Sequence, residues 1–149
     1  MNIKAIDFQI LTRHYKNYQD GVSVIESEKE KFLEKLEPIK KEMNSIISAA
    51  SSGLIMDNNS QQKKAEDFQR LQSEAIEMDR DFKISLKKMT DDLNEKVYDE
   101  LSEIITEWSL SNSVDLVTGK MEVIYCNDKY DATNLILDIL KEKDLYVEI

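Results

Sequence analysis

The most regular feature of the sequence is a stripe of apolar residues between Val22 and Ala50, spaced alternately by three and four. Eight of its nine positions are apolar and the ninth is a lysine: Val22, Ile25, Lys29, Phe32, Leu36, Ile39, Met43, Ile46 and Ala50. Such a sustained heptad stripe indicates a helix packed along its length on another helix. Pro38 lies inside this helix and is expected to kink it, because proline removes a backbone donor and crowds the preceding turn.

A second stripe, from about Gln61 to Trp108, predicts a return helix. It begins in heptads and continues mostly in steps of four: Phe68, Leu71, Ala75, Met78, Phe82, Leu86, Met89, Leu93, Val97, Leu101, Ile104 and Trp108. At about 1.5 Å per residue, this helix would be roughly 70 Å long. Residues 51–60 predict the turn between the helices, with Gly53 suited to a helix end and four candidates to cap the next helix: Asp57, Asn58, Asn59 and Ser60.

The start of the chain predicts a short strand and then a helix. The strand is an apolar run formed by Ile3, Ala5, Ile6 and Phe8. Helical spacing begins at Gln9, with a face formed by Leu11, Tyr15 and Tyr18. Gly21 is expected to interrupt the helix or to bend the residues beyond it.

The last forty residues change character. Residues 114–117 and 121–126 have strand-like patterns, and the Thr118–Lys120 linker contains a glycine, which predicts a β-hairpin. Asp131 or Thr133 would cap a short helix whose apolar face is formed by Leu135, Ile136, Ile139 and Leu140. The tail 145–149 is expected to add a strand.

Together these elements predict an α+β fold, a long antiparallel helical hairpin on a small β-sheet body. The body would comprise residues 1–21 and 110–149, and the coiled-coil arm residues 22–109, with its tip at about 51–60. A sheet of three short strands has open edges and a thin core, so we expect subunits to associate and complete it. The candidate oligomer interface is formed by Ile3, Ile6, Val114, Leu116, Val123 and Ile124.

The composition agrees with exposed helices, because 34% of the 149 residues are charged and only three glycines and one proline occur. The net charge of -10 would repel a phosphate backbone, which argues against nucleic-acid binding. About -6 of this charge falls in residues 57–109. Its simplest meaning is a solvated, soluble surface.

The sequence offers little for catalysis or metal binding. Cys126 is the only cysteine, so no intrachain disulfide or cysteine metal site is complete, and we expect a buried structural thiol. His14 is the only histidine and is expected to be structural or on the surface. There is no glycine-rich phosphate loop and no metal-ligand spacing. We therefore expect no enzyme, no cofactor and no metal.

No stretch approaches eighteen apolar residues, and the N-terminus lacks a basic segment followed by a long apolar core. We therefore expect neither membrane insertion nor a secretion signal, and hence a cytoplasmic protein. If the chain is a mature form, a periplasmic location is expected instead.

Two blocks of sequence resemble the Skp/OmpH-like chaperones, the seventeen-kilodalton proteins. They are Ile3–Leu11, and Val114–Val117 continuing through Tyr125 to Lys129–Leu137, and they flank a long charged hairpin. The resemblance implies a trimer in which three β-rich ends form one body and three hairpins surround a cavity. It also implies ATP-independent holding of unfolded outer-membrane proteins. The best-known members are strongly basic, so the acidity of this chain leaves its clients open.

We therefore expect a holdase. The alternative is a structural or assembly (scaffold) protein, such as a phage-encoded relative, that uses the same architecture with a fixed folded partner. At the tip, Leu54, Ile55 and Met56 are candidates for client contact, although they could instead staple the turn. A comparable choice concerns Met43, Met78 and Met89, since methionine suits promiscuous binding surfaces but at this spacing is expected to pack in the helix seam.

Overall fold

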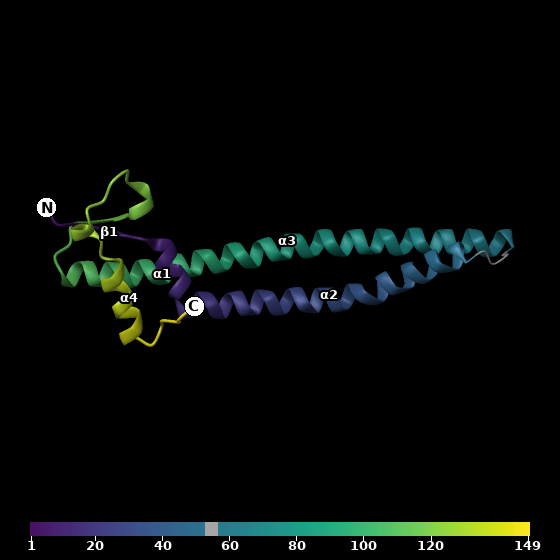
Figure 1. The fold of residues 1–149 in the computed structure, drawn as a ribbon, viewed down its shortest axis with the longest axis horizontal. Helices are drawn as coiled ribbons and strands as arrows, with labels where there is room; N and C mark the ends of the chain where they lie inside the picture. The colour runs from purple at the N-terminus through teal and green to yellow at the C-terminus, as the bar shows by residue number, and fades with distance from the viewer. Residues whose placement is uncertain (53–56) are drawn as a thin grey trace. The chain divides into compact units, whose positions relative to one another are not determined.

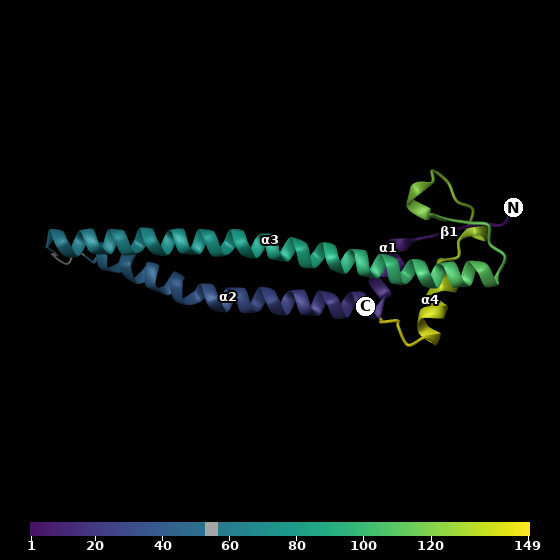
Figure 2. The same cartoon turned by 180° about the vertical axis from the view of Figure 1, so that it is seen from behind.

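The structure is a computed structural model that describes residues 1–52 and 57–149. Its elements follow the order β1, α1, α2, α3, β2, two short 3-10 helices and α4 (Figures 1 and 2). Their bounds are β1 Ile3–Ile6, α1 Phe8–His14, α2 Lys16–Ser51, α3 Asn58–Ser111, β2 Leu116–Gly119, η1 Lys120–Glu122, η2 Asp128–Tyr130 and α4 Thr133–Glu142. The predicted α+β class with two long helices and a small sheet is confirmed.

The chain divides into two compact units, which we call the body unit and the arm unit. The body unit comprises Met1–Val24 and Thr90–Ile149, and the arm unit comprises Ile25–Met89. Helices α2 and α3 contribute to both units. The division into residues 1–21, 22–109 and 110–149 stays a prediction.

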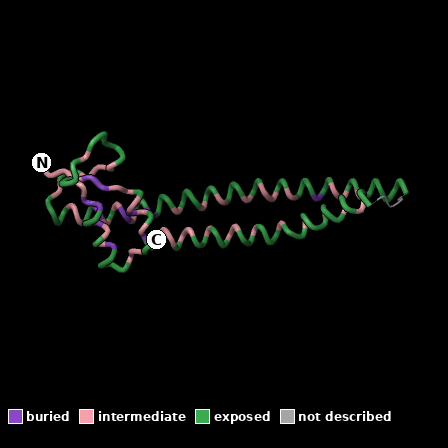
Figure 3. Tube along the Cα trace, viewed as in Figure 1, coloured by how far each residue is buried: buried purple, intermediate pink, exposed green. Residues whose placement is uncertain are grey.

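Within the arm unit, the two helices pack through the predicted stripes. The rings of Phe32 and Phe82 stack with their centroids 4.2 Å apart and nearly parallel. Stripe residues are partly or fully buried, with Leu71 at 3% exposure, while most residues between them are exposed (Figure 3). Of the predicted stripe, Ala50 alone is exposed, and Ala49 is half-buried instead. Helix α2 continues through Pro38.

Of the four candidate caps for the return helix, the structure selects Asp57. Its Oδ1 accepts a hydrogen bond from the Ser60 N–H at 2.7 Å, and its carbonyl accepts one from the Gln61 N–H at 3.1 Å. These bonds satisfy donors that a helix N-terminus otherwise leaves free.

The sheet of the body unit pairs β1 with β2 in parallel, with Ile3 opposite Leu116 and Ile6 opposite Gly119. Parallel strands need a long connection, and here α1, α2 and α3 provide it. The predicted β-hairpin is wrong. Residues 120–122 form a 3-10 turn and residues 123–126 form no strand, because β2 pairs with the N-terminal strand across the chain.

The core of the body unit lies between α1, α3 and α4. It contains Ile6, Leu11, Tyr15, Val97, Leu101, Ile105, Ala132, Ile136 and Leu140. On α4, Ile136 and Leu140 are buried as predicted, whereas Leu135 is 52% exposed. Neither Asp131 nor Thr133 is the N-cap residue of α4, which is Ala132, although Asp131 Oδ1 accepts a hydrogen bond from the Thr133 N–H at 3.0 Å.

Three local expectations need correction in the body unit. Gly21 does not interrupt the helix, which instead breaks at Tyr15, between α1 and α2, while a bend beyond Gly21 stays a prediction. Phe8 begins α1 and lies outside the strand. The tail forms no strand, although Tyr146 makes an isolated antiparallel bridge to Tyr15.

Candidate functional site

An open groove of about 580 Å³ runs between α3 and the sheet of the body unit. Ile6 and Ile105 form a buried floor, at 4% and 8% exposure. Tyr98, Leu110 and Leu116 also line the groove and remain more than half exposed. All residues from Val114 to Gly119 line it, although alternate strand residues point to opposite faces. The groove therefore extends along all of β2 and the two residues before it.

A second apolar surface follows β2 directly. Residues 121–125, which we call the exposed segment, include Met121, Val123, Ile124 and Tyr125. All four are exposed, and Ile124 is fully so. So much uncovered apolar surface beside an apolar groove is characteristic of an interaction site.

The structure places five of the six predicted interface residues on one or the other of these two surfaces. Ile6, Val114 and Leu116 line the groove, and Val123 and Ile124 belong to the exposed segment. Ile3 is half-buried on β1. Their role in association stays a prediction.

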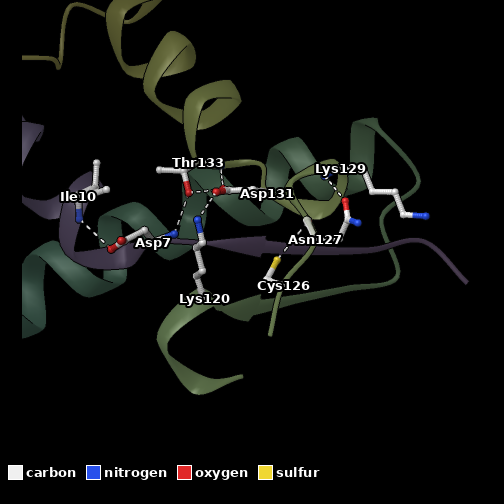
Figure 4. A network of polar contacts seen from close by, with 8 residues as sticks. All are labelled: Asp7, Ile10, Lys120, Cys126, Asn127, Lys129, Asp131 and Thr133. Atoms are coloured by element: carbon white, nitrogen blue, oxygen red, sulfur yellow. Dashed lines mark hydrogen bonds and ion pairs between the residues drawn. The ribbon is translucent and has the colours of Figure 1, made fainter. Parts of the chain in front are cut away.

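A polar network anchors the chain on either side of the exposed segment (Figure 4). Lys120 Nζ lies 2.8 Å from Asp131 Oδ2, which joins the residue just before the exposed segment to a residue two positions before α4. The Thr133 hydroxyl donates to Asp131 Oδ1 at 2.6 Å and accepts from the Asp7 N–H at 2.8 Å. The network thus connects the end of β1, the segment and α4.

The pKa shifts of Asp131 and Lys120 both favour the charged forms that make this ion pair. Partial burial opposes the charge of Asp131, but hydrogen bonds from Lys120 and Thr133 outweigh it and lower the pKa of the carboxyl. The same hydrogen bond, with the nearby charge of Asp131, raises the pKa of Lys120. The ion pair therefore persists across the physiological pH range.

A second polar cluster lies beside the core. The hydroxyl of Tyr15 donates to Glu100 Oε2 at 2.6 Å, and Asn17 donates to the same oxygen at 3.1 Å. Burial and the Glu100 hydrogen bond raise the pKa of Tyr15 to about 12. Burial opposes the charge of Glu100, yet the hydrogen bonds from Tyr15 and Asn17 lower its pKa.

The surface of the arm unit combines scattered apolar residues with balanced charge. Leu33, Ile47, Ile76 and Ile84 are at least half exposed. Residues 25–89 contain thirteen acidic and twelve basic side chains, so they are nearly neutral. The acidity of the return helix instead lies in residues 91–107, with seven carboxylates and one lysine. The predicted client-facing residues Leu54, Ile55 and Met56 lie outside the described residues.

The described part of the chain holds no group of three or more His, Cys, Asp or Glu side chains placed to bind a metal. His14 packs its ring against Tyr146, with centroids 5.0 Å apart. Cys126 is a free thiol, but it is only partly buried and lies outside any strand, so the expectation of a buried strand cysteine is wrong. Within residues 1–52 and 57–149, no helix is long and apolar enough to cross a membrane.

Sequence reasoning missed the α3 wall of the groove. Tyr98 and Ile105 are seven residues apart, and each follows directly after a stripe residue, Val97 and Ile104. This second stripe beside the first was a signal that α3 contacts more than one partner surface in the body unit.

The fold defines a class of protein: a small α+β body whose β1 and β2 are connected through a helical hairpin. A family model for outer membrane proteins (OmpH-like) matches residues 2–140. The chain therefore belongs to the OmpH-like family, as the two sequence blocks predicted.

A solved OmpH-like protein from Caulobacter crescentus CB15, provisionally assigned as an outer membrane chaperone, shares the fold. The TM-score is 0.81, and the match covers 99% of this chain and 88% of the other at 9% sequence identity. At that identity the likeness concerns the fold. No curated protein sequence matches the chain. The family and the fold together support a chaperone-type function.

Proposed function

We propose that this protein is an ATP-independent holdase that acts as a homotrimer, with helical arms that enclose unfolded or partly folded proteins and prevent their aggregation. The observation that carries the proposal is the surface of the arm unit in a chain of the OmpH-like family. Outward apolar residues, set among nearly balanced charges, can contact many different clients without repelling either sign of charge.

Many separate weak contacts suit a holdase. Each exposed side chain, such as Leu33 or Ile84, contributes little by itself, and a client segment can leave it quickly. Release then needs no nucleotide, so the mechanism works equally in a compartment with ATP or without it.

The groove and the exposed segment support the trimer. They are different surfaces of one chain, so insertion of one subunit's segment into the next subunit's groove would be a heterologous contact. Such contacts form a closed ring when the rotation between subunits fits. Burial of Ile124 and Leu116 in this way would cover apolar surface that a free monomer leaves in water.

The solution mass tests the trimer. Light scattering across micromolar concentrations should give about three times the chain mass of 17.3 kDa. Ile124→Asp places a charge on the exposed segment and should lower the mass toward that of one chain. Asn134→Asp adds the same charge at an exposed position of α4 and should leave the mass unchanged. A monomer in the unmodified protein contradicts the trimer.

Suppression of aggregation tests the holdase. A denatured client diluted into buffer should stay soluble at one trimer per client. Serine at four arm positions should weaken this protection: Leu33, Ile47, Ile76 and Ile84. Alanine at three exposed polar positions on the same helices is the control: Asn44, Ser73 and Ser85. No protection of any client by the unmodified protein would reject the proposal, and a folded partner at fixed stoichiometry would favour the scaffold.

A further inference from the structure

The break between α1 and α2 stands where the sequence favours an uninterrupted helix. Residues 9–20 contain neither glycine nor proline, and their apolar residues have helical spacing. Yet Tyr15 has extended backbone angles, with φ -77° and ψ 120°. Because these residues by themselves favour a continuous helix, contacts from elsewhere in the chain must hold Tyr15 in its extended conformation.

The backbone hydrogen bonds identify those contacts. In an uninterrupted helix, the Lys16 N–H would bond to the Thr12 carbonyl and the Tyr18 N–H to the His14 carbonyl. In the structure, the Thr12 carbonyl accepts a hydrogen bond from the Tyr15 N–H at 3.2 Å instead. The Tyr18 N–H donates to the Tyr15 carbonyl at 3.1 Å. The Lys16 N–H and the His14 carbonyl are thereby left without helical partners.

The tail supplies both missing partners. The Leu145 carbonyl accepts from the Lys16 N–H at 2.8 Å, and the Val147 N–H donates to the His14 carbonyl at 2.8 Å. The tail thus pairs the backbone donor and the backbone acceptor that the break leaves without helical partners, so the break and the docked tail support each other.

Side chains fix the tail in the same place. The Tyr146 ring stacks on the His14 ring at 5.0 Å, nearly parallel, and Lys141 Nζ lies 4.7 Å from the centroid of the Tyr146 ring. His14 Nδ1 lies 2.9 Å from the Val147 carbonyl oxygen. Both views show the C-terminus beside the junction of α1 and α2 (Figures 1 and 2).

We propose that residues 145–147 form a strap that holds the break at Tyr15, and that α1 and α2 join into one continuous helix when the strap leaves. The body unit then contains a two-state element, and the docked tail sets the direction of the first turns of α2. This inference does not depend on the chaperone proposal, because it concerns the body unit alone.

Two proline substitutions separate the two states. Val147→Pro removes the donor to His14 and should release the strap. Lys16→Pro removes the donor to Leu145, but proline suits the first position of a helix and favours an extended residue before it, which Tyr15 already is. Lys16→Pro therefore preserves the break even when the strap has left.

Carbon NMR of the full-length chain, labelled on its tyrosines, reports the strap through Tyr146 and the break through Tyr15 in one spectrum. In Val147→Pro, the Tyr146 signals should move to those of an exposed tail residue, and the Cα shift of Tyr15 should change from extended to helical. In the double variant with Lys16→Pro, Tyr146 should stay released while Tyr15 returns to the extended shift. Ile149→Pro is the matched control and should resemble the unmodified protein.

Each other outcome overturns the proposal. If Tyr15 keeps its extended shift after the strap has left, the break is intrinsic to residues 8–18. If Val147→Pro leaves Tyr146 in place, the backbone bonds do not hold the tail. If Lys16→Pro fails to restore the extended shift, the two states are not the break and the continuous helix. None of these results depends on client protection, so each proposal can fail without the other.

Discussion

The side chain of Leu93 lies directly against the backbone of α2 at Gly21, where an added Cβ would overlap both of its methyl groups. Gly21 thus permits the close approach of two helices within the body unit. Glycine in a helix interior costs about 0.5–1 kcal/mol relative to alanine, and here close packing offsets that cost. This explains why α2 runs through a residue that was expected to interrupt it.

We predict that Gly21→Ala destabilises the protein when residue 93 is leucine and stabilises it when residue 93 is alanine. In the unmodified protein, overpacking against Leu93 costs about 1–3 kcal/mol and outweighs the gain in helix propensity. In a Leu93→Ala background the overlap is gone, so the same substitution should stabilise by about 0.5–1 kcal/mol. Urea unfolding of the four variants, at one protein concentration, measures this cycle. A stabilising effect in both backgrounds would contradict the close packing.

The seam of the arm unit should depend on the stacked pair Phe32 and Phe82. Phe82→Ala removes the stack and much apolar contact, and because the ring is only half-buried we expect a loss of about 2–3 kcal/mol. Ile84→Ala, on the same helix but 65% exposed, should change stability by less than about 0.5 kcal/mol. Circular dichroism during urea unfolding compares them, and equal losses would show that the stripe does not form the seam.

Acid should weaken the network around the exposed segment. The pKa of Asp131 is lowered in the folded state, so its contribution to stability is present above the ordinary value of 3.8 and is lost as the pH falls below it. Asp131→Asn should cost about 1–2 kcal/mol at neutral pH, because hydrogen bonds to a charged group are lost. The difference from the unmodified protein should shrink at low pH. Asp138→Asn, at an exposed position of α4, should show neither effect.

High pH should destabilise the folded protein through deprotonation of Tyr15. Its pKa is raised from 10.0 to about 12 in the folded state, so its contribution is full below pH 10 and is lost as the pH rises toward 12. A pKa shift of this size corresponds to a contribution of roughly 2–3 kcal/mol to the free energy of unfolding. Tyr15→Phe should therefore reduce the loss of stability between pH 10 and 12, whereas Tyr125→Phe, at an exposed position, should not. Identical pH profiles for all three proteins would show that Tyr15 is not buried against Glu100.

The sequence alone determined the parts of this protein that repeat with a local period. The stripes of α2 and α3, the strand β1 and the short helix α4 all follow from the spacing of apolar residues, because burial of one face imposes that spacing on neighbouring residues. The two blocks that resemble OmpH-like proteins also indicated the family. Asp57 was among the predicted caps because few residue types can accept the free donors of a helix start.

Only the tertiary structure decided which segments meet. Three features join residues more than eighty positions apart: Ile3 pairs with Leu116, the tail bonds to the backbone at the break, and Ile6 lines the groove with Tyr98. Local spacing carries no information about such partners. Residues 121–126 have the composition of a strand, but β2 pairs with β1 instead. The Lys120–Asp131 ion pair joins the residue just before the exposed segment to a residue two positions before α4. A strand forms only where another strand takes its hydrogen bonds, and that choice belongs to the folded chain.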